Sequence, residues 1–230
     1  MKMTSKLIAA VMLAGTFSVA QAGPMDVFDL KDDNGDAVFI DSRGEGAFYD
    51  TGKAHAQLTD TDGDKDSAGA FLLFEFAGFA NINNFGIYDP NDSSQTLQVF
   101  SGTDSSNLNE NSKVNFDLDA GTAKTAYGTA NIGSTFGFYL QRGDKMFYSD
   151  AGLNGGVDMT KIFDVTESFN SDFSNSSLIV AFEDLIDGDF DYNDLIVGIS
   201  DVQAVPEPGT LALFGLGLVG LGMTRRRKSA

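Results

Sequence analysis

The sequence contains no cysteine and no tryptophan, and it has a single histidine, His55. Without cysteine the chain can form neither disulfides nor thiolate metal sites, and it offers no cysteine nucleophile. One imidazole is too few for the zinc, copper and haem sites that need several nitrogen or sulfur ligands. His55 follows Gly52-Lys53-Ala54 in a polar stretch, and this position favours an exposed loop residue.

Basic residues are also scarce. The chain has 15 lysines and arginines against 33 aspartates and glutamates, which gives a formal net charge of −18. Four of the bases are clustered at residues 225–228, so the rest of the chain is more acidic still. Such a surface repels a phosphate backbone. We therefore exclude nucleic acid as a partner.

Proline is rare and glycine abundant, at 4 and 26 residues, which suits short strands joined by tight turns. Hydrophobic residues make up 42% of the chain, enough for a packed core. No helical period of useful length occurs between residues 23 and 205, where short apolar or alternating runs are separated by Gly, Asn, Asp or Ser. This pattern predicts an all-β domain over residues 23–204, an antiparallel β-sandwich or jelly roll. The expected strands are Ala37–Ile40, Ala47–Tyr49, Ala70–Phe76, Asn84–Tyr88, Thr96–Phe100, Lys113–Leu118, Thr135–Leu140, Met146–Ser149, Lys161–Val165, Ser177–Phe182 and Leu195–Ile199.

The N-terminus has the three parts of a secretory signal peptide. Lys2 and Lys6 precede an apolar run from Leu7 to Val19, and Ala20 and Ala22 form an A-x-A cleavage site. We expect residues 1–22 to be a signal helix that directs the chain to the Sec translocon and is then removed.

The C-terminal segment, residues 205–230, combines a short motif, an apolar run and a basic cluster. Pro206, Glu207 and Pro208 come first, and an uncharged run follows from Thr210 to Thr224. As a helix this run is about 22 Å long, against roughly 30 Å of bilayer hydrocarbon. We therefore expect a short transmembrane helix that anchors the chain only transiently in the inner membrane. The basic cluster stays cytoplasmic by the positive-inside rule, and it consists of Arg225, Arg226, Arg227 and Lys228.

These three C-terminal parts, in this order and spacing, closely resemble the PEP-CTERM sorting signal. The resemblance implies a Gram-negative bacterium, recognition by an exosortase and sorting to the cell surface. It further implies an association with exopolysaccharide and biofilm matrix. The same module has also been labelled an ice-binding protein C-terminal domain, although nothing in these residues binds ice.

The most concentrated acidic stretch lies between two apolar runs, at residues 178–181 and 195–197. Like charges held about 4 Å apart repel by about 4 kcal/mol at an effective dielectric near 20, so a hard divalent cation is the simplest partner. On an extended segment, alternation places four oxygen-bearing side chains on one face and Phe190 and Tyr192 on the other. Calcium binds such oxygen ligands, and the competing interpretation is an acidic turn with solvated side chains. The predicted ligands are Asp187, Asp189, Asp191 and Asn193, completed by Glu183, Asp184 and Asp194.

A second acidic cluster alternates in the same way, with Asp60, Asp62, Asp64 and Asp66. It is not an EF-hand, because a lysine replaces the required glycine and a phenylalanine replaces the bidentate glutamate. We favour a solvated loop, and a calcium site of another type stays open.

The acidic stretch also carries a second resemblance. The run Phe182-Glu183-Asp184-Leu185, followed by Asn193-Asp194-Leu195, resembles the end of a domain of unknown function found in PEP-CTERM and other exported bacterial proteins. The resemblance covers approximately residues 70–199. It implies a β-sandwich with a calcium site and a matrix-related role without established catalysis.

We therefore expect an exported, calcium-stabilised and non-catalytic surface or matrix protein. A secreted carbohydrate-binding module is the main alternative. A glycoside hydrolase is a weaker one, because carboxylates are plentiful but no tryptophan is available for a sugar platform. The chain also contains no G-x-S-x-G nucleophile elbow.

Overall fold

The computed structural model describes residues 25–59, 65–74, 82–101, 111–169 and 171–206. The predicted signal peptide, the sorting segment after Pro206 and the acidic residues 60–64 lie outside these ranges, and Asp66 is described by its backbone alone. The only helical elements within these ranges are short 3-10 turns. None of the helices described is long and apolar enough to cross a membrane.

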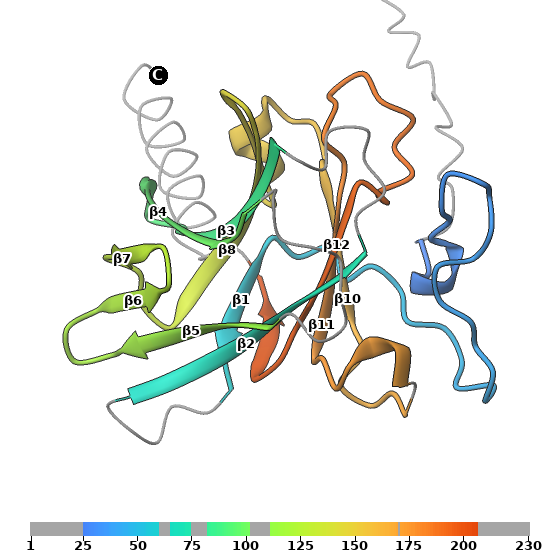
Figure 1. Ribbon diagram of the computed structural model, residues 1–230, viewed down its shortest axis with the longest axis horizontal. Helices are drawn as coiled ribbons and strands as arrows, with labels where there is room; N and C mark the ends of the chain where they lie inside the picture. The colour runs from blue at the N-terminus through green and yellow to red at the C-terminus, as the bar shows by residue number, and fades with distance from the viewer. Residues whose placement is uncertain (1–24, 60–64, 75–81, 102–110, 170, 207–230) are drawn as a thin grey trace, which may run out of the picture.

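The described chain is all-β, as predicted, and every strand pair in its two sheets is antiparallel. One sheet has the order β13-β1-β8-β3-β4, with β9 also paired to β8 (Figure 1). The other has the order β10-β11-β12-β2-β5-β6-β7. The first sheet comprises β1 (His55–Leu58), β3 (Asn83–Asp89), β4 (Asp92–Phe100), β8 (Thr135–Arg142), β9 (Lys145–Tyr148) and β13 (Val202–Val205). The second comprises β2 (Lys65–Phe74), β5 (Asn111–Asp117), β6 (Thr122–Thr125), β7 (Gly128–Ala130), β10 (Thr160–Asp164), β11 (Leu178–Phe182) and β12 (Leu195–Ile199).

The two sheets share one hydrophobic core, and this gives the fold its sandwich-like arrangement. The core draws buried side chains from both sheets. Phe85 of β3 meets Phe182 of β11 edge to face, with ring centroids 6.2 Å apart. Phe116 of β5 stacks on Phe136 of β8 at 5.3 Å. Aromatic pairs of this kind add to the free energy gained by burying their surface.

A second core lies on the outer side of β10, β11 and β12, under the N-terminal segment, residues 25–50. Figure 1 shows this segment, in blue, alongside these strands. Val27, Leu30 and Phe39 pack there against Phe163, Ile179 and other residues of the sheet and its loops. Strand β11 is therefore buried on both faces, which explains why it is a continuous apolar run rather than an alternating one.

The N-terminal segment does not form the strands predicted at residues 37–40 and 47–49. It makes only isolated bridges there, which join Lys31 to Ala37 and Asp26 to Tyr49. The apolar residues that suggested strands serve instead as anchors in the second core, where Phe39 packs on Phe173 with ring centroids 4.9 Å apart. The other predicted strands form within the described residues, which exclude residues 75 and 76 of the strand predicted at 70–76, and β8 and β9 pair as a hairpin. Strands β1, β6, β7 and β13 were not predicted.

The prediction that His55 is an exposed loop residue is wrong. His55 begins β1, which lies between β13 and β8, and the residue is only 2% exposed. Its Nε2 atom lies 3.4 Å from the hydroxyl of Tyr88. Gly137 makes room for this pair, because a Cβ atom there would lie 2.3 Å from the Tyr88 ring. The polar sequence before His55 gave no sign that a buried strand begins at this residue.

Candidate functional site

The acidic stretch forms the loop that joins β11 to β12. These strands are antiparallel neighbours, and Phe182 at the end of β11 pairs with Leu195 at the start of β12. The loop, residues 183–194, therefore begins and ends at adjacent points (Figure 1). The backbone N–H of Glu183 donates to the carbonyl of Met159, at 3.0 Å, and so fixes the start of the loop. This topology brings six carboxylates to one end of the sheet.

Three of the predicted ligands come together in the loop. Glu183, Asp189 and Asp191 each place one carboxylate oxygen within 4.8 Å of the other two. Glu183 is only 1% exposed, Asp191 is half-buried and Asp189 is exposed. The cluster is thus closed on its Glu183 side and accessible on its Asp189 side. We call these three residues the acidic cluster.

The Glu183 carboxylate is held in place without a full set of hydrogen bonds. Its Oε2 atom is buried and has no hydrogen-bond partner among the described residues. A Cβ atom on Gly188 would lie 2.0 Å from the Oε1 atom of Glu183, so a larger residue there would displace this carboxylate. A buried polar atom without a partner costs about 1–3 kcal/mol, and more if the group is charged. The buried Glu183 oxygen therefore lowers the stability of the fold unless a further group bonds to it.

The surroundings of the cluster favour the protonated acids. Burial raises the pKa of Glu183 to about 7, and the nearby carboxylates of Asp194, Asp189 and Asp191 raise it further in the same direction. Burial likewise raises the pKa of Asp194 to about 6, against a hydrogen bond from the Asp184 N–H that lowers it. The pKa of Asp191 is raised by burial as well. A bound cation would reverse these shifts, because it favours the ionised carboxylates.

Asp184 and Asp194 have structural partners instead. Asp184 is 1% exposed and accepts from Arg142 and from the Asn83 side chain, each at 3.1 Å. These bonds tie the loop to β8 and β3 of the other sheet. Asp194 accepts from the backbone N–H of Asp184 at 2.7 Å, which closes the base of the loop. Asp187 is exposed and is not part of the acidic cluster.

The middle of the loop is not the extended segment that the alternation suggested. Phe190 and Tyr192 have φ angles of 56° and 57°, in the left-handed region that non-glycine residues rarely adopt. The side-chain amide of Asn193 donates to Asp191 and to the carbonyl of Lys31, each at 2.7 Å. Asn193 therefore positions Asp191 and attaches the loop to the N-terminal segment. The backbone turns at Phe190 and Tyr192 bring Asp189 and Asp191 back toward Glu183.

This arrangement can hold a cation. Carboxylate oxygens are the ligands that hard divalent ions prefer, and calcium accepts roughly six to eight oxygens from flexible groups. Among the described residues, Arg142 forms an ion pair with Asp184, and Lys161 forms ion pairs with Asp50 and Asp158. None of these three acids belongs to the acidic cluster. Sequence reasoning missed the roles of Arg142, Asn83 and Gly188. Arg142 and Asn83 lie far from the loop in the sequence. Only Gly188 could have been noticed, because it is a glycine within an acidic run.

The chain is an all-β protein of antiparallel sheets with an acidic cluster that can hold a metal ion. The PEP-CTERM protein-sorting motif matches residues 204–228, so the chain carries that motif, as its C-terminal residues predicted. The motif indicates an exported protein that an exosortase sorts. It begins within β13, at Ala204, and the exposed Pro206 directly follows this strand. No curated protein and no solved structure matches the chain significantly.

Proposed function

We propose that the chain is a non-catalytic protein of the cell surface or extracellular matrix, with a β-sandwich that a calcium ion stabilises. The PEP-CTERM motif supports export and sorting. An association with exopolysaccharide or biofilm is the role we infer for the sorted product. In this proposal the ion binds Glu183, Asp189 and Asp191 at one end of the sandwich and links β11 to the rest of the loop.

The observation that carries the calcium proposal is the buried Oε2 atom of Glu183, which has no hydrogen-bond partner among the described residues. An acidic loop on a surface can leave its carboxylates in water at little cost. Glu183 is buried and cannot do so. A calcium ion supplies the missing partner, and it also offsets the repulsion from Asp189 and Asp191.

A non-catalytic role agrees with the positions of the groups that catalysis would need. His55, the single histidine, is buried in β1. The Ser149 hydroxyl, which lies near it, donates to the carbonyl of Ala54 and accepts from the Phe138 N–H. A glycosidase could use a glutamate with a raised pKa as its acid. Glu183, however, is too buried for a glycosidic oxygen to reach it.

The decisive experiment is thermal unfolding of the full chain in 10 mM calcium and in chelator. Extracellular calcium modules bind with Kd values of about 10⁻⁴–10⁻³ M, so this concentration adds about 1.4–2.7 kcal/mol to the stability. For a domain of this size we expect calcium to raise Tm by about 3–10 °C. The double variant Asp189→Asn with Asp191→Asn should lose this increase.

The matched control removes the same two charges elsewhere, with Asp119→Asn and Asp144→Asn in the exposed hairpin turns after β5 and β8. The control should keep the calcium response in full. Equal Tm values in calcium and chelator for the unmodified chain would overturn the calcium proposal. Equal losses in both double variants would show a general charge effect instead of a site.

The location is tested separately by cell fractionation. We expect the processed chain in the surface or matrix fraction. A variant with Pro206→Ala and Pro208→Ala should stay in the inner membrane, because the motif is then altered where an exosortase recognises it. Recovery of both forms in the same fraction would contradict sorting through this motif.

A further inference from the structure

A groove of about 780 Å³ lies at the other end of β10 and β11 from the acidic cluster. Asp164 at the end of β10 and Ser177 just before β11 line it, while Glu183 follows the opposite end of β11. Five strand residues separate the two ends, or about 16 Å. The volume is within the range of about 300–1,000 Å³ that is typical of small-ligand sites. The groove is thus separate from the acidic cluster in space and in composition.

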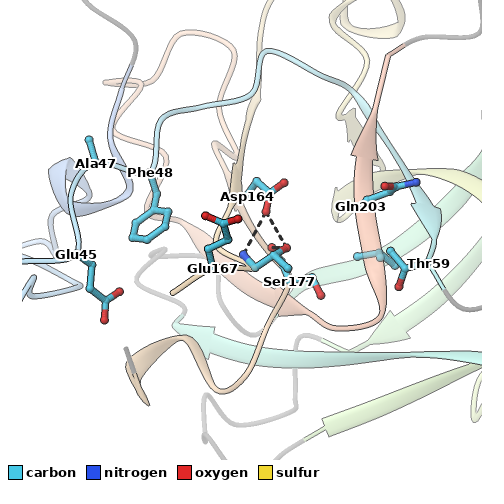
Figure 2. Close-up of a pocket in the computed structure, with 10 residues that line it drawn as sticks. Glu45, Ala47, Phe48, Thr59, Asp164, Glu167, Ser177 and Gln203 are labelled. Carbon is cyan, nitrogen blue, oxygen red and sulfur yellow. Dashed lines mark hydrogen bonds between the residues drawn. The ribbon is translucent and has the colours of Figure 1, made fainter. Parts of the chain in front are cut away.

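The walls of this groove are acidic and contain no base. Glu45, Asp164 and Glu167 line it, and no lysine, arginine or histidine is among the lining residues. Figure 2 shows Glu45 and Glu167 on one side, beside the ring of Phe48, and Thr59 and Gln203 on the opposite side. A concave wall of one charge concentrates its potential on whatever enters. The groove therefore selects for a cation and rejects an anionic polymer.

The exposed carboxylates keep hydrogen-bonding capacity for a ligand. The Oε2 atom of Glu45 accepts from the hydroxyl of Ser168 and its Oε1 atom is buried, so Glu45 acts on a ligand through its charge. Asp164 accepts from the N–H and the hydroxyl of Thr166 through its Oδ1 atom, at 3.1 and 2.8 Å. An acceptor of this kind is satisfied by a donor that carries a positive charge, and such bonds are roughly twice as strong as neutral ones.

The rest of the lining suits a ring that carries hydroxyl groups. Thr59 and Gln203 can both donate and accept. Phe48 is half-buried, and its ring is held by Phe28 and Phe173 with centroids 6.0 Å away in each case. A fixed aromatic ring offers an apolar surface to the C–H face of a sugar. The groove therefore combines carboxylates, neutral polar groups and one rigid ring.

We propose that this groove binds a hexosamine unit with a free amine. The ammonium group bonds to the exposed carboxylate of Glu167 and is attracted by the charge of Glu45, the sugar hydroxyls bond to Thr59 and Gln203, and the ring lies against Phe48. A lysine side chain would supply the ammonium but no hydroxyls, so it would leave the opposite wall unused. An N-acetylated sugar would supply hydroxyls but no charge.

Calorimetric titration of the full chain tests this proposal, with a glucosamine tetramer and its N-acetylated counterpart as probes. The titration is run in chelator at physiological salt and at about pH 6, where an amine is protonated. We expect the glucosamine tetramer to bind at least about tenfold more tightly, because it forms charge-assisted hydrogen bonds. Glu45→Gln with Glu167→Gln should weaken its binding by about tenfold or more. Asp119→Asn with Asp144→Asn removes the same charge elsewhere and should change Kd by less than about twofold.

Three results would overturn the proposal. Equal affinity for the two tetramers would show that the amine is not recognised. Equal weakening in the two double variants would show only an attraction to the acidic surface. Tetralysine binding as tightly as the glucosamine tetramer would identify a site for basic peptides. None of these results bears on calcium, because the titration is done in chelator and the acidic cluster is unchanged in every variant.

Discussion

The acidic cluster and the groove each gather three carboxylates, but they surround them differently. In the cluster, Glu183 is 1% exposed and lies behind Gly188. In the groove, Asp164 and Glu167 are exposed. Water screens Asp164 and Glu167, whereas it has almost no access to Glu183. A carboxylate therefore lowers the stability of the fold at Glu183, whereas the exposed carboxylates of the groove are available to a ligand.

This difference decides what each region should reveal in an experiment. Changes in the acidic cluster and its supports should alter the free energy of unfolding, because the fold itself holds the charges there. Changes in the groove should alter binding and leave stability almost unchanged.

The largest effect should come from Asp184→Ala. This change removes the carboxylate that Arg142 and Asn83 bond to, and it leaves the Arg142 guanidinium, which is only 10% exposed, without its acidic partner in this pair. Loss of one member of a buried ion pair costs about 3–5 kcal/mol. Urea unfolding should show this loss as a lower midpoint with an unchanged slope.

The exposed Asp187 provides the control for that measurement. Asp187→Ala should change the free energy of unfolding by less than about 0.5 kcal/mol, as is usual for surface positions. If Asp184→Ala were as mild as this control, the loop would not depend on its attachment to β8 and β3.

The next effect should have opposite signs in chelator and in calcium. Glu183→Gln removes a buried charge, so in chelator at about pH 8 we expect it to stabilise the chain by about 1–3 kcal/mol. In calcium the same change removes a ligand, and the increase in Tm caused by the ion should be lost. Thermal unfolding under both conditions measures the crossover. A variant that is destabilised in chelator would contradict the idea that the ionised Glu183 destabilises the metal-free chain.

The sequence was informative where burial follows from pattern. Apolar runs predicted β11 and β12, and the acids between them predicted a loop under repulsion. The ligand set was harder to predict, because it depends on backbone turns at Phe190 and Tyr192 that no residue preference indicates. Contacts of long sequence separation were also hidden. Asp184 accepts a hydrogen bond from Asn83, which is 101 residues away in the sequence, and a local sequence pattern does not predict such a pair.

The N-terminal segment shows the converse error. Its apolar residues form short continuous runs such as strands also have, yet Phe39 and Phe48 pack on Phe173 in an irregular cover. Pattern reports that a side chain is buried, but it does not report whether the backbone beside it has a strand to pair with. The edge of a sheet and the cover over its face therefore look alike in sequence.

A smaller effect should appear as a pH dependence of the metal-free chain. The pKa of Glu183 is raised from 4.5 to about 7, and that of Asp194 from 3.8 to about 6. Because the folded state holds these protons more tightly than the unfolded chain, the stabilisation is complete below about pH 4 and is lost as pH rises through about 7. In chelator we expect Tm to fall between pH 5 and 7.5, by an amount corresponding to about 1–2 kcal/mol.

Two comparisons make this pH profile specific. Glu183→Gln should flatten most of the decline, because the group that titrates is gone. Calcium should also oppose the decline, since the ion binds the ionised carboxylates and becomes more effective as pH rises. A profile that is the same in the unmodified chain and in Glu183→Gln would assign the decline to other acids.

The smallest effect on stability should come from the groove. Glu167 is exposed and makes no hydrogen bond or ion pair that the described residues record, so Glu167→Gln should change the free energy of unfolding by less than about 0.5 kcal/mol. The calcium response should be unchanged, because Asp164 and Glu183 lie at opposite ends of the β10–β11 pair. Thermal unfolding with and without calcium checks both expectations. A lost calcium response would mean that the two acidic regions act as one, since nothing in the contacts of Glu167 would otherwise carry its effect to the far end of β11.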